Sequence, residues 1–256
     1  MSSAQTCYDV TTLEQQLEER GFFVIENFLN RAEIGAALQE TLEAVAAAEP
    51  LPNPQERDFF EVFSLHSKNS LNLDRPALNA IDQKPELRSV MHGLLGEDCH
   101  ALGKLFQAYL PHAGHKQSWH TDSDPDDLPF QLLTCLIYLQ DQTPELGYTR
   151  FVPGTHRTRI SKRFDSHADL PRQVCQTVPA GTLCCFVSTV WHSATENRSG
   201  TPRVVYGLRF CRKEFAPSIM PGPYGRERHA NGFRRFGKPI LDRPNDECSY
   251  PWPESW

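Results

Sequence analysis

His120 and Asp122 are separated by a single residue, and His192 follows 70 positions after Asp122. A mononuclear iron that must also bind a bidentate co-substrate and O2 leaves one face for the protein, and two imidazoles with one carboxylate fill it. Residues two apart at a strand end point the same way, so His120 and Asp122 can reach one ion. His192 follows the apolar run GTLCCFVSTVW, which indicates the end of a buried strand. We interpret the three residues as metal ligands; for His192 alone, a structural core histidine is the alternative.

A second His-x-Asp pair, His167 with Asp169, competes for the same interpretation. It lies in the polar segment RFDSHADLPRQ, which is bounded by Pro171 and has no apolar strand beside it. Only 23 residues separate Asp169 from His192, whereas the 70 after Asp122 allow several strands to close a barrel. We interpret the second pair as part of a solvated turn.

Arg203 lies 11 positions after His192, immediately before the apolar stretch VVYGLRF. A guanidinium is permanently charged and recognises a carboxylate through two parallel hydrogen bonds. The far end of 2-oxoglutarate requires such a partner. Arg203 is therefore the candidate that binds this co-substrate.

The elements that would position these residues change in character along the chain. Helical spacing of apolar residues covers 11–20, 31–48 and 85–95, and FFVIENFL after Gly21 is typical of a buried strand and turn. Strand patterns separated by Pro and Gly follow from Ala101 onward, at 104–110, 131–139, 147–152, 173–178, 182–187 and 204–211. Helices followed by antiparallel strands predict a mainly β fold with flanking helices, a double-stranded β-helix (jelly roll, cupin-like).

Length and composition are compatible with a single domain. The chain has 256 residues, 39% of them hydrophobic and 23% charged, which is usual for a soluble globular protein. We expect a helical part at about 1–100, a jelly-roll core at about 101–212 and a wrap at about 213–256. That last segment holds seven of the 20 prolines from residue 214 onward.

Charge and cysteine usage restrict the partners and the compartment. A net charge of −6 and a pI near 5.9 give no field for a polyanion, so we expect no nucleic acid. Without a run of roughly 20 apolar residues or an export signal, we expect no membrane partner and a cytoplasmic location. The eight cysteines are scattered without a Cys-x-x-Cys pair, and we expect free thiols. The oligomeric state is left open.

Four stretches spread over the chain resemble one family: GFFVIENFL, SWHTDSDP, LGYTRFVPGTHR and AGTLCCFVSTVWHSATENRSGTPRVVYGLRF. Together they are similar to the phytanoyl-CoA dioxygenase family of Fe(II)/2-oxoglutarate-dependent oxygenases. The resemblance implies a jelly-roll core, Fe(II) on His120, Asp122 and His192, and Arg203 on the distal carboxylate of 2-oxoglutarate. Thr134 and Gln107, from their strand positions, are further candidates to contact the co-substrate; ordinary strand residues are the alternative.

The resemblance also implies a reaction. Such enzymes consume O2 and 2-oxoglutarate, release CO2 and succinate, and oxidise a small-molecule substrate; a specialised metabolite is the expectation here. Halogenating relatives replace the carboxylate of the triad by a small residue, so Asp122 favours hydroxylation over halogenation. Desaturation, epoxidation and ring closure use the same ligands. Tyr148 stands where many relatives keep a second small residue, and this difference affects the expected shape of the pocket wall.

Two other functions are compatible with the barrel. A non-oxidative metal cupin, such as an isomerase, would not need Arg203, and a non-catalytic sensor would bind ligand without turnover. The charge clusters beside the site do not identify the substrate, because one is acidic and the other basic, and solvated loops explain both. They comprise Asp124, Asp126 and Asp127, and Arg157, Arg159, Lys162 and Arg163.

Overall fold

The structure is a computed structural model. It describes residues 8–47, 59–63, 75–109, 111, 117, 119–122, 132–157 and 167–213, with only the backbone given at 59–63, 102–103 and 105–106. The predicted C-terminal wrap, the acidic cluster and the basic cluster apart from Arg157 lie outside these residues. No helix among the described residues is long and apolar enough to cross a membrane.

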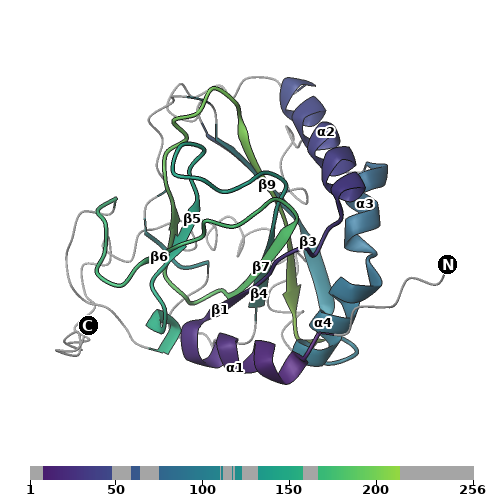
Figure 1. The fold of residues 1–256 in the computed structure, drawn as a ribbon. Coiled ribbons are helices and arrows are strands. Elements are labelled where there is room, and N and C mark those ends of the chain that lie inside the picture. Colours follow the sequence, from purple (N-terminus) through teal and green to yellow (C-terminus); the bar gives the residue numbers. More distant parts are fainter. Residues whose placement is uncertain are drawn as a thin grey trace, which may run out of the picture.

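The described strands form two antiparallel sheets, which confirms the predicted jelly roll with flanking helices (Figure 1). The large sheet has the order β1-β7-β4-β9-β3-β2, and the small sheet has the order β6-β5-β8. The large-sheet strands are β1 (Phe22–Ile25), β2 (Phe59–Phe63), β3 (His100–Tyr109), β4 (Leu132–Tyr138), β7 (Thr182–Val187) and β9 (Arg203–Cys211). The small-sheet strands are β5 (Thr149–Phe151), β6 (Val174–Cys175) and β8 (His192–Ala194).

Helices cover one side of the large sheet. Figure 1 shows α2 (Arg31–Ala47), α3 (Pro76–Asp82) and α4 (Pro85–Leu95) beside β3 and β9, with α1 (Val10–Arg20) below the sheet. Asp9 begins α1 by accepting the Thr11 N–H at 3.1 Å, and Gly21 ends it with φ of 85°. The helices predicted at 11–20, 31–48 and 85–95 are confirmed to within a residue at each end, whereas the short α3 was not predicted.

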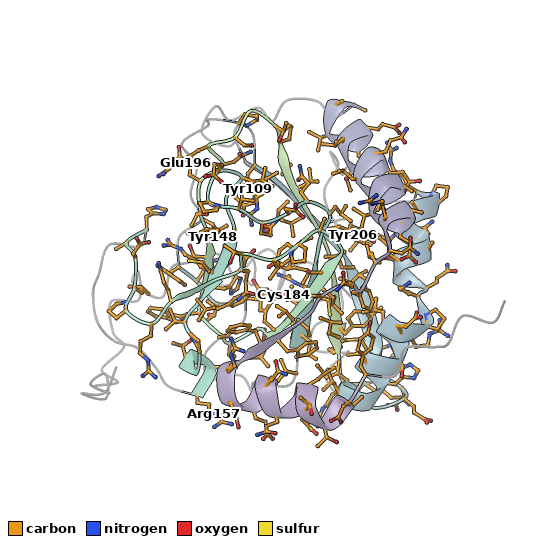
Figure 2. All side chains as sticks on the ribbon, viewed as in Figure 1. Tyr109, Tyr148, Arg157, Cys184, Glu196 and Tyr206 are labelled. Atoms are coloured by element: carbon orange, nitrogen blue, oxygen red, sulfur yellow. The ribbon has the colours of Figure 1, made fainter. Side chains whose placement is uncertain are left out.

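Alternation along β9 gives the large sheet two different faces. Tyr206 belongs to the outer face, where its hydroxyl donates to Asp82 of α3 at 2.5 Å (Figure 2). Arg203 and Arg209 belong to the inner face, since both are an odd number of positions from Tyr206. Their neighbour on this face is Thr134, paired with Arg209 and also with Phe186 of β7. Two arginines on a buried strand therefore point between the sheets, which is the place for a polar site.

The outer face and the helices form the apolar core. Leu133, Ile137, Leu183 and Leu208 are 4% exposed or less, and Cys135 of β4 lies 3.8 Å from the Met91 sulfur of α4. The six cysteines among the described residues are free thiols, as predicted.

Candidate metal centre

His120, Asp122 and His192 come together between the sheets, and their ligand atoms all lie within 4.8 Å of one another. Asp122 Oδ1 is 3.6 Å from His192 Nε2 and 3.9 Å from His120 Nε2. None of the three residues is more than 8% exposed. Among the described residues this is the cluster with metal-ligand geometry, and its mixed nitrogen and oxygen donors suit a mononuclear iron with open positions.

Backbone hydrogen bonds set the two histidines opposite each other. The N–H of His120 donates to the carbonyl of His192, and the N–H of His192 donates back, both at 3.0 Å. This bridge attaches the segment around His120 to the edge of the small sheet at β8. Asp122 is held by its own N–H, which donates to the carbonyl of Ser188 at 2.7 Å. All three ligands are therefore anchored through the main chain.

The His192 imidazole has one nitrogen available for a metal. Its Nδ1 lies 3.1 Å from the carbonyl of Val190, so the Nδ1–H donates there and Nε2 keeps its lone pair facing Asp122. Burial, with a smaller effect of the neighbouring His120, lowers the pKa of His192 to about 3 in spite of Asp122. The ring is therefore neutral at ordinary pH, as a metal ligand requires.

The two carboxylate oxygens of Asp122 have different surroundings. Oδ2 accepts a hydrogen bond from Thr134 Oγ1 at 2.9 Å and pairs with Arg209 Nη2 at 3.0 Å. Burial by itself would raise the pKa of Asp122, but Arg209 and the two histidines outweigh it and lower this pKa well below its usual range. Asp122 is therefore ionised, and Oδ1 is the oxygen left for a metal. Sequence reasoning missed Arg209, although its even spacing from Arg203 on one strand was a signal.

Arg203 is fully buried at the start of β9. Its Nε donates to Gln142 Oε1 and its Nη2 to Thr149 Oγ1, both at 3.2 Å, and the guanidinium lies 4.6 Å above the Tyr109 ring. Nη1 has no hydrogen-bond partner among the described residues, and no described carboxylate pairs with the side chain. Burial lowers the pKa of Arg203, although Tyr109 and Tyr138 act in the opposite direction. A buried guanidinium with a spare donor fits an anionic ligand such as the carboxylate of 2-oxoglutarate.

The small sheet relates Arg203 to the triad. Thr149, which accepts from Arg203, pairs with Ala194 in β8, and Phe151 pairs with His192. Two residues along an antiparallel strand span about 7 Å, so Thr149, which contacts Arg203, and Phe151, which pairs with His192, are about that far apart along β5.

Thr134 and Gln107, the other predicted contacts of the co-substrate, lie in different parts of the site. Thr134 lies beside Asp122 rather than beside Arg203, as its hydrogen bond shows. Gln107 is half-buried on β3, two residues from Tyr109 and paired with Val205, so it belongs to the inner face that carries Arg203. Their contact with the co-substrate stays a prediction.

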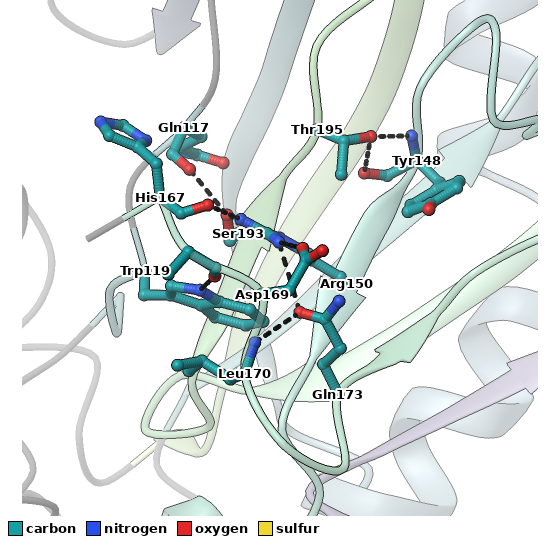
Figure 3. Close-up of polar contacts among 11 residues, drawn as sticks. Gln117, Trp119, Tyr148, Arg150, His167, Asp169, Leu170, Gln173, Ser193 and Thr195 are labelled. Atoms are coloured by element: carbon teal, nitrogen blue, oxygen red, sulfur yellow. Dashed lines mark hydrogen bonds and ion pairs between the residues drawn. The ribbon is translucent and has the colours of Figure 1, made fainter. Parts of the chain in front are cut away.

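The competing pair at His167 and Asp169 surrounds the Arg150 guanidinium, whose side chain alternates with the inward Thr149 and Phe151 and so leaves the opposite face of the small sheet (Figure 3). The Asp169 carboxylate, 84% exposed, accepts from Arg150 Nη1 at 2.7 Å. Arg150 itself is buried, and its guanidinium lies 4.5 Å above the Trp119 ring. Asp169 is thus part of an ion pair outside the barrel, and the choice of Asp122 over it agrees with the geometry.

Tyr148 also lies on this outer side. It directly precedes β5, two residues from Arg150 and one from the inward Thr149, and its main chain bonds to Thr195 (Figure 3). Its side chain interacts with Cys175 and Arg150. The expectation that Tyr148 shapes the pocket wall is therefore wrong, because strand alternation turns its side chain away from the pocket.

Comparison with known proteins extends these observations. The ectoine dioxygenase of Bordetella bronchiseptica is 25% identical over 246 residues, covering 82% of this chain and 77% of the relative. Two solved structures share the fold. The non-heme alpha-ketoglutarate-dependent epimerase SnoN of nogalamycin biosynthesis has a TM-score of 0.65 and 17% identity, with 79% of this chain and 80% of that chain covered. HygX of Streptomyces hygroscopicus, with nickel and 2-oxoglutarate bound, has a TM-score of 0.64 and 14% identity, with 79% of this chain and 87% of that chain covered.

The family comparison covers both sheets. Residues 17–205 match the family described as phytanoyl-CoA dioxygenase (PhyH), and this span includes His120, Asp122, His192 and Arg203. It comprises roughly three quarters of the 256 residues. The chain therefore belongs to the phytanoyl-CoA dioxygenase family.

Proposed function

We propose that this protein is a non-haem Fe(II)- and 2-oxoglutarate-dependent oxygenase that hydroxylates a small molecule. His120, Asp122 and His192 would hold the iron, and Arg203 the distal carboxylate of 2-oxoglutarate. The observation that carries the proposal is a buried three-ligand face combined with a buried guanidinium whose Nη1 has no described partner. Iron and 2-oxoglutarate are the cofactors that the family and this donor set indicate.

Iron, when bound, supplies the oxidising chemistry: with O2 and 2-oxoglutarate it oxidises the substrate while CO2 and succinate are released. The side chains of this protein prepare the site. Arg209 and Thr134 keep Asp122 ionised and oriented, and Val190 fixes the tautomer of His192. The Phe186 and Phe151 rings, with centroids 4.6 and 6.0 Å from that of His192, line the cluster with apolar surface. Such a wall excludes water and strengthens the electrostatic interactions inside it.

The substrate class rests on the relatives. A structure of SnoN contains nogalamycin RO, and a structure of HygX contains hygromycin B. Both are small molecules, and they support a small-molecule substrate here. Hydroxylation is favoured over halogenation because Asp122 occupies the position that a halide would need.

Arg203 also separates this function from the alternatives. A metal isomerase or a metal sensor has no need for a buried carboxylate clamp beside an open metal face. The Arg203 side chain is 0% exposed, so keeping it without an anionic ligand would leave an uncompensated charge in the core.

The test measures succinate release from 2-oxoglutarate by the Fe(II)-loaded protein. We expect release that requires both Fe(II) and 2-oxoglutarate. Loss of the bidentate contact in Arg203→Met should raise the KM for 2-oxoglutarate roughly 10- to 100-fold. The matched control is Arg88→Met on the exposed face of α4, which should behave as wild type.

Two results would contradict the proposal. Fe(II)-independent turnover, or no succinate with any compound of a metabolite extract, would argue for an isomerase or a sensor. An unchanged KM in Arg203→Met would remove Arg203 from the co-substrate site. The mass change of the consumed compound, a gained oxygen or a lost pair of hydrogens, distinguishes hydroxylation from desaturation.

A further inference from the structure

Arg150 of β5 contacts both of the segments that carry the histidine ligands, from the side of the small sheet that faces away from the metal (Figure 3). Its guanidinium lies 4.5 Å from the centre of the Trp119 ring, and Trp119 directly precedes His120. Its Nε donates to Ser193 Oγ at 3.3 Å, and Ser193 directly follows His192. One side chain on the outer side of the sheet therefore touches a chain neighbour of each histidine.

Ser193 extends this contact to the main chain of Gln117. Its hydroxyl has one hydrogen, which it donates to the carbonyl of Gln117 at 2.6 Å, so a lone pair is left to accept from Arg150. The N–H of Gln117 donates to the carbonyl of Ala194 at 3.1 Å, in the same two segments. The pairing that sets the two histidines opposite each other therefore includes a side-chain bridge, and Arg150 holds the hydroxyl at its centre.

The other donors of Arg150 hold its guanidinium in one orientation. Nη1 donates to Asp169 Oδ1 at 2.7 Å, and Nη2 donates to the carbonyl of His167 at 3.1 Å. The indole of Trp119 donates to the carbonyl of Ala168 at 2.8 Å, in the same segment. The ring and the guanidinium that lies over it are therefore held by one stretch of chain.

Pairing with Asp169 does not explain why a charge is buried at this place. Arg150 is 2% exposed, whereas its carboxylate partner is 84% exposed, and water screens an ion pair that is open on one side. An apolar side chain of similar size would fill the same space without the loss of hydration. It would not supply a rigid fork of donors with fixed directions. The arrangement is therefore explained by geometry and not by charge.

We propose that Arg150 is a positioning residue for the metal centre, which acts through Trp119 and Ser193 to set how the imidazoles of His120 and His192 lie relative to each other. This inference rests on the proposed function, because it concerns the same metal site. Ligands that are held in place before the metal arrives bind it more tightly, since no free energy is lost in bringing them together. A guanidinium that joins both histidine segments supplies such a constraint from behind the sheet.

The experiment is a calorimetric titration of the full chain with Ni(II), well below the unfolding temperature, so that no turnover is required. Arg150→Met keeps an apolar stem and removes the donors. We expect the Kd for Ni(II) to rise about tenfold, as the loss of a group that orients metal ligands would give. Arg150→Lys keeps the charge without the planar fork, and we expect it to bind as weakly as the Met variant. Ser193→Ala removes the bridging hydroxyl and should also raise the Kd.

Two controls separate positioning from stability. Asp169→Ala removes the exposed ion pair and leaves the contacts of Arg150 with Trp119 and Ser193, so it should bind Ni(II) as wild type does. Leu87→Ala opens a cavity in the apolar core beneath α4, where Leu87 is 1% exposed. It should lower the Tm and leave the Kd for Ni(II) within about twofold, because the site is untouched.

The outcomes separate this inference from the proposed function. Wild-type protein that does not bind Ni(II) would overturn both. Wild-type binding with an equal Kd in Arg150→Met would overturn only the role of Arg150. Full recovery of affinity in Arg150→Lys would mean that the charge matters and not the fork, and an equal loss in Leu87→Ala would mean that stability matters; either result overturns the proposal. If Arg150→Met does not fold, an unchanged Kd in Ser193→Ala does so.

Discussion

Asp122 shows how a single residue of the site serves two purposes. Its Oδ2 is held by Arg209 at 3.0 Å and Thr134 at 2.9 Å, so the carboxylate cannot rotate freely. Its Oδ1 faces both imidazoles and is left for the metal. A carboxylate so arranged binds a metal through one oxygen, which leaves more of the coordination sphere for the co-substrate.

Replacing Asp122 tests the choice between the two His-x-Asp pairs. Asp122→Ala removes one of three ligands, and we expect Ni(II) binding and Fe(II)-dependent 2-oxoglutarate decarboxylation to be lost. Asp169→Ala removes the exposed partner of Arg150, and we expect normal metal binding with a loss of about 1 kcal/mol in the free energy of unfolding. Equal loss of metal binding in the two variants would show that the pairs had been assigned wrongly.

Arg209 should affect the affinity for the metal although it is not itself a metal ligand. In Arg209→Met the Asp122 carboxylate loses its charged partner and becomes free to turn. We expect Ni(II) affinity to fall roughly 10- to 100-fold, the usual effect of losing a group that orients a metal ligand. Arg198→Met, whose side chain is 67% exposed, is the matched control and should bind as wild type. Unchanged affinity in Arg209→Met would mean that Thr134 alone orients the carboxylate.

Alternation along strand β9 places successive side chains on the site and against the helices. Its odd-numbered positions from Arg203 to Arg209 face the site, and its even-numbered positions from Val204 to Phe210 pack under the helices. A slip of one residue in its pairing would bury both guanidinium groups against the helices and turn Tyr206 into the pocket. One register with β4 from Val205 to Cys211, and one with β3 from Arg203 to Arg209, exclude such a slip.

The junction of α1 with the short 3-10 helix η2 (Thr155–Arg157) carries a buried histidine. His156 is 6% exposed, and its Nε2–H donates to the carbonyl of Glu18 near the end of α1 at 3.1 Å. Gly21 ends that helix so close to the ring that an added Cβ would lie 2.7 Å from His156 Nδ1. Burial lowers the pKa of His156 to about 4, and Arg157 adds to the effect, although the hydrogen bond to Glu18 opposes it. The junction therefore requires a neutral imidazole.

This histidine should make the stability of the fold depend on pH. The unfolded chain binds a proton at His156 below its ordinary pKa of 6.5, whereas the folded chain does so only below about 4. The stabilising contribution is thus complete above pH 6.5 and is lost as the pH falls toward 4. Between about pH 7.5 and about pH 5 we expect His156→Gln, which cannot take up this proton, to lose about 2 kcal/mol less unfolding free energy than wild type.

Urea unfolding at the two pH values measures this difference. Glutamine keeps an amide donor for the Glu18 carbonyl, so the variant should fold. His92→Gln, on the half-buried side of α4, is the control at another histidine. Parallel pH dependence in wild type and His156→Gln would show that His156 is protonated in the folded protein as readily as in the unfolded chain.

Across the whole molecule, the site is built from both sheets. His192 comes from the small sheet and His120 and Asp122 from the segment bridged to its edge, whereas Arg203, Arg209 and Thr134 come from the large sheet. Ligands bound between them therefore link two layers that meet elsewhere through rings such as Phe151 and Phe186, 5.2 Å apart. Binding energy at the site should appear as stability of the entire fold.

Thermal unfolding measures this linkage. A ligand at 100 times its Kd adds about 2.7 kcal/mol, which for a chain of this size corresponds to a rise in Tm of about 5–10 °C. We expect Ni(II) to raise the Tm and 2-oxoglutarate to raise it further only when Ni(II) is present. Asp122→Ala should show neither rise. A rise with 2-oxoglutarate in the absence of metal would place its binding elsewhere.

The cluster of His120, Asp122 and His192 and the main strands could be predicted from the amino-acid sequence, because each rests on local information. Alternation identifies a strand, Pro and Gly mark its ends, and residue types with suitable spacing identify donors. β7 was predicted residue for residue, and β3 and β4 were shifted by a few residues at their ends. The two-residue β6 and the three-residue β8 and β5 are too short to carry a period, which is why their bounds were predicted poorly or not at all.

The residues that contact the metal-ligand side chains could not be predicted, because they depend on how distant strands pair in the folded protein. Arg209 meets Asp122 because β4 pairs with β9 in one particular register, and His120 meets His192 because its segment bridges to β8 across some 70 residues. Register between distant strands is chosen by the sum of many side-chain contacts across the sheet, and no short window of residues contains that sum. The donor atoms were therefore readable in the sequence, whereas their orientation and charge balance arose from the packing of one sheet against the other.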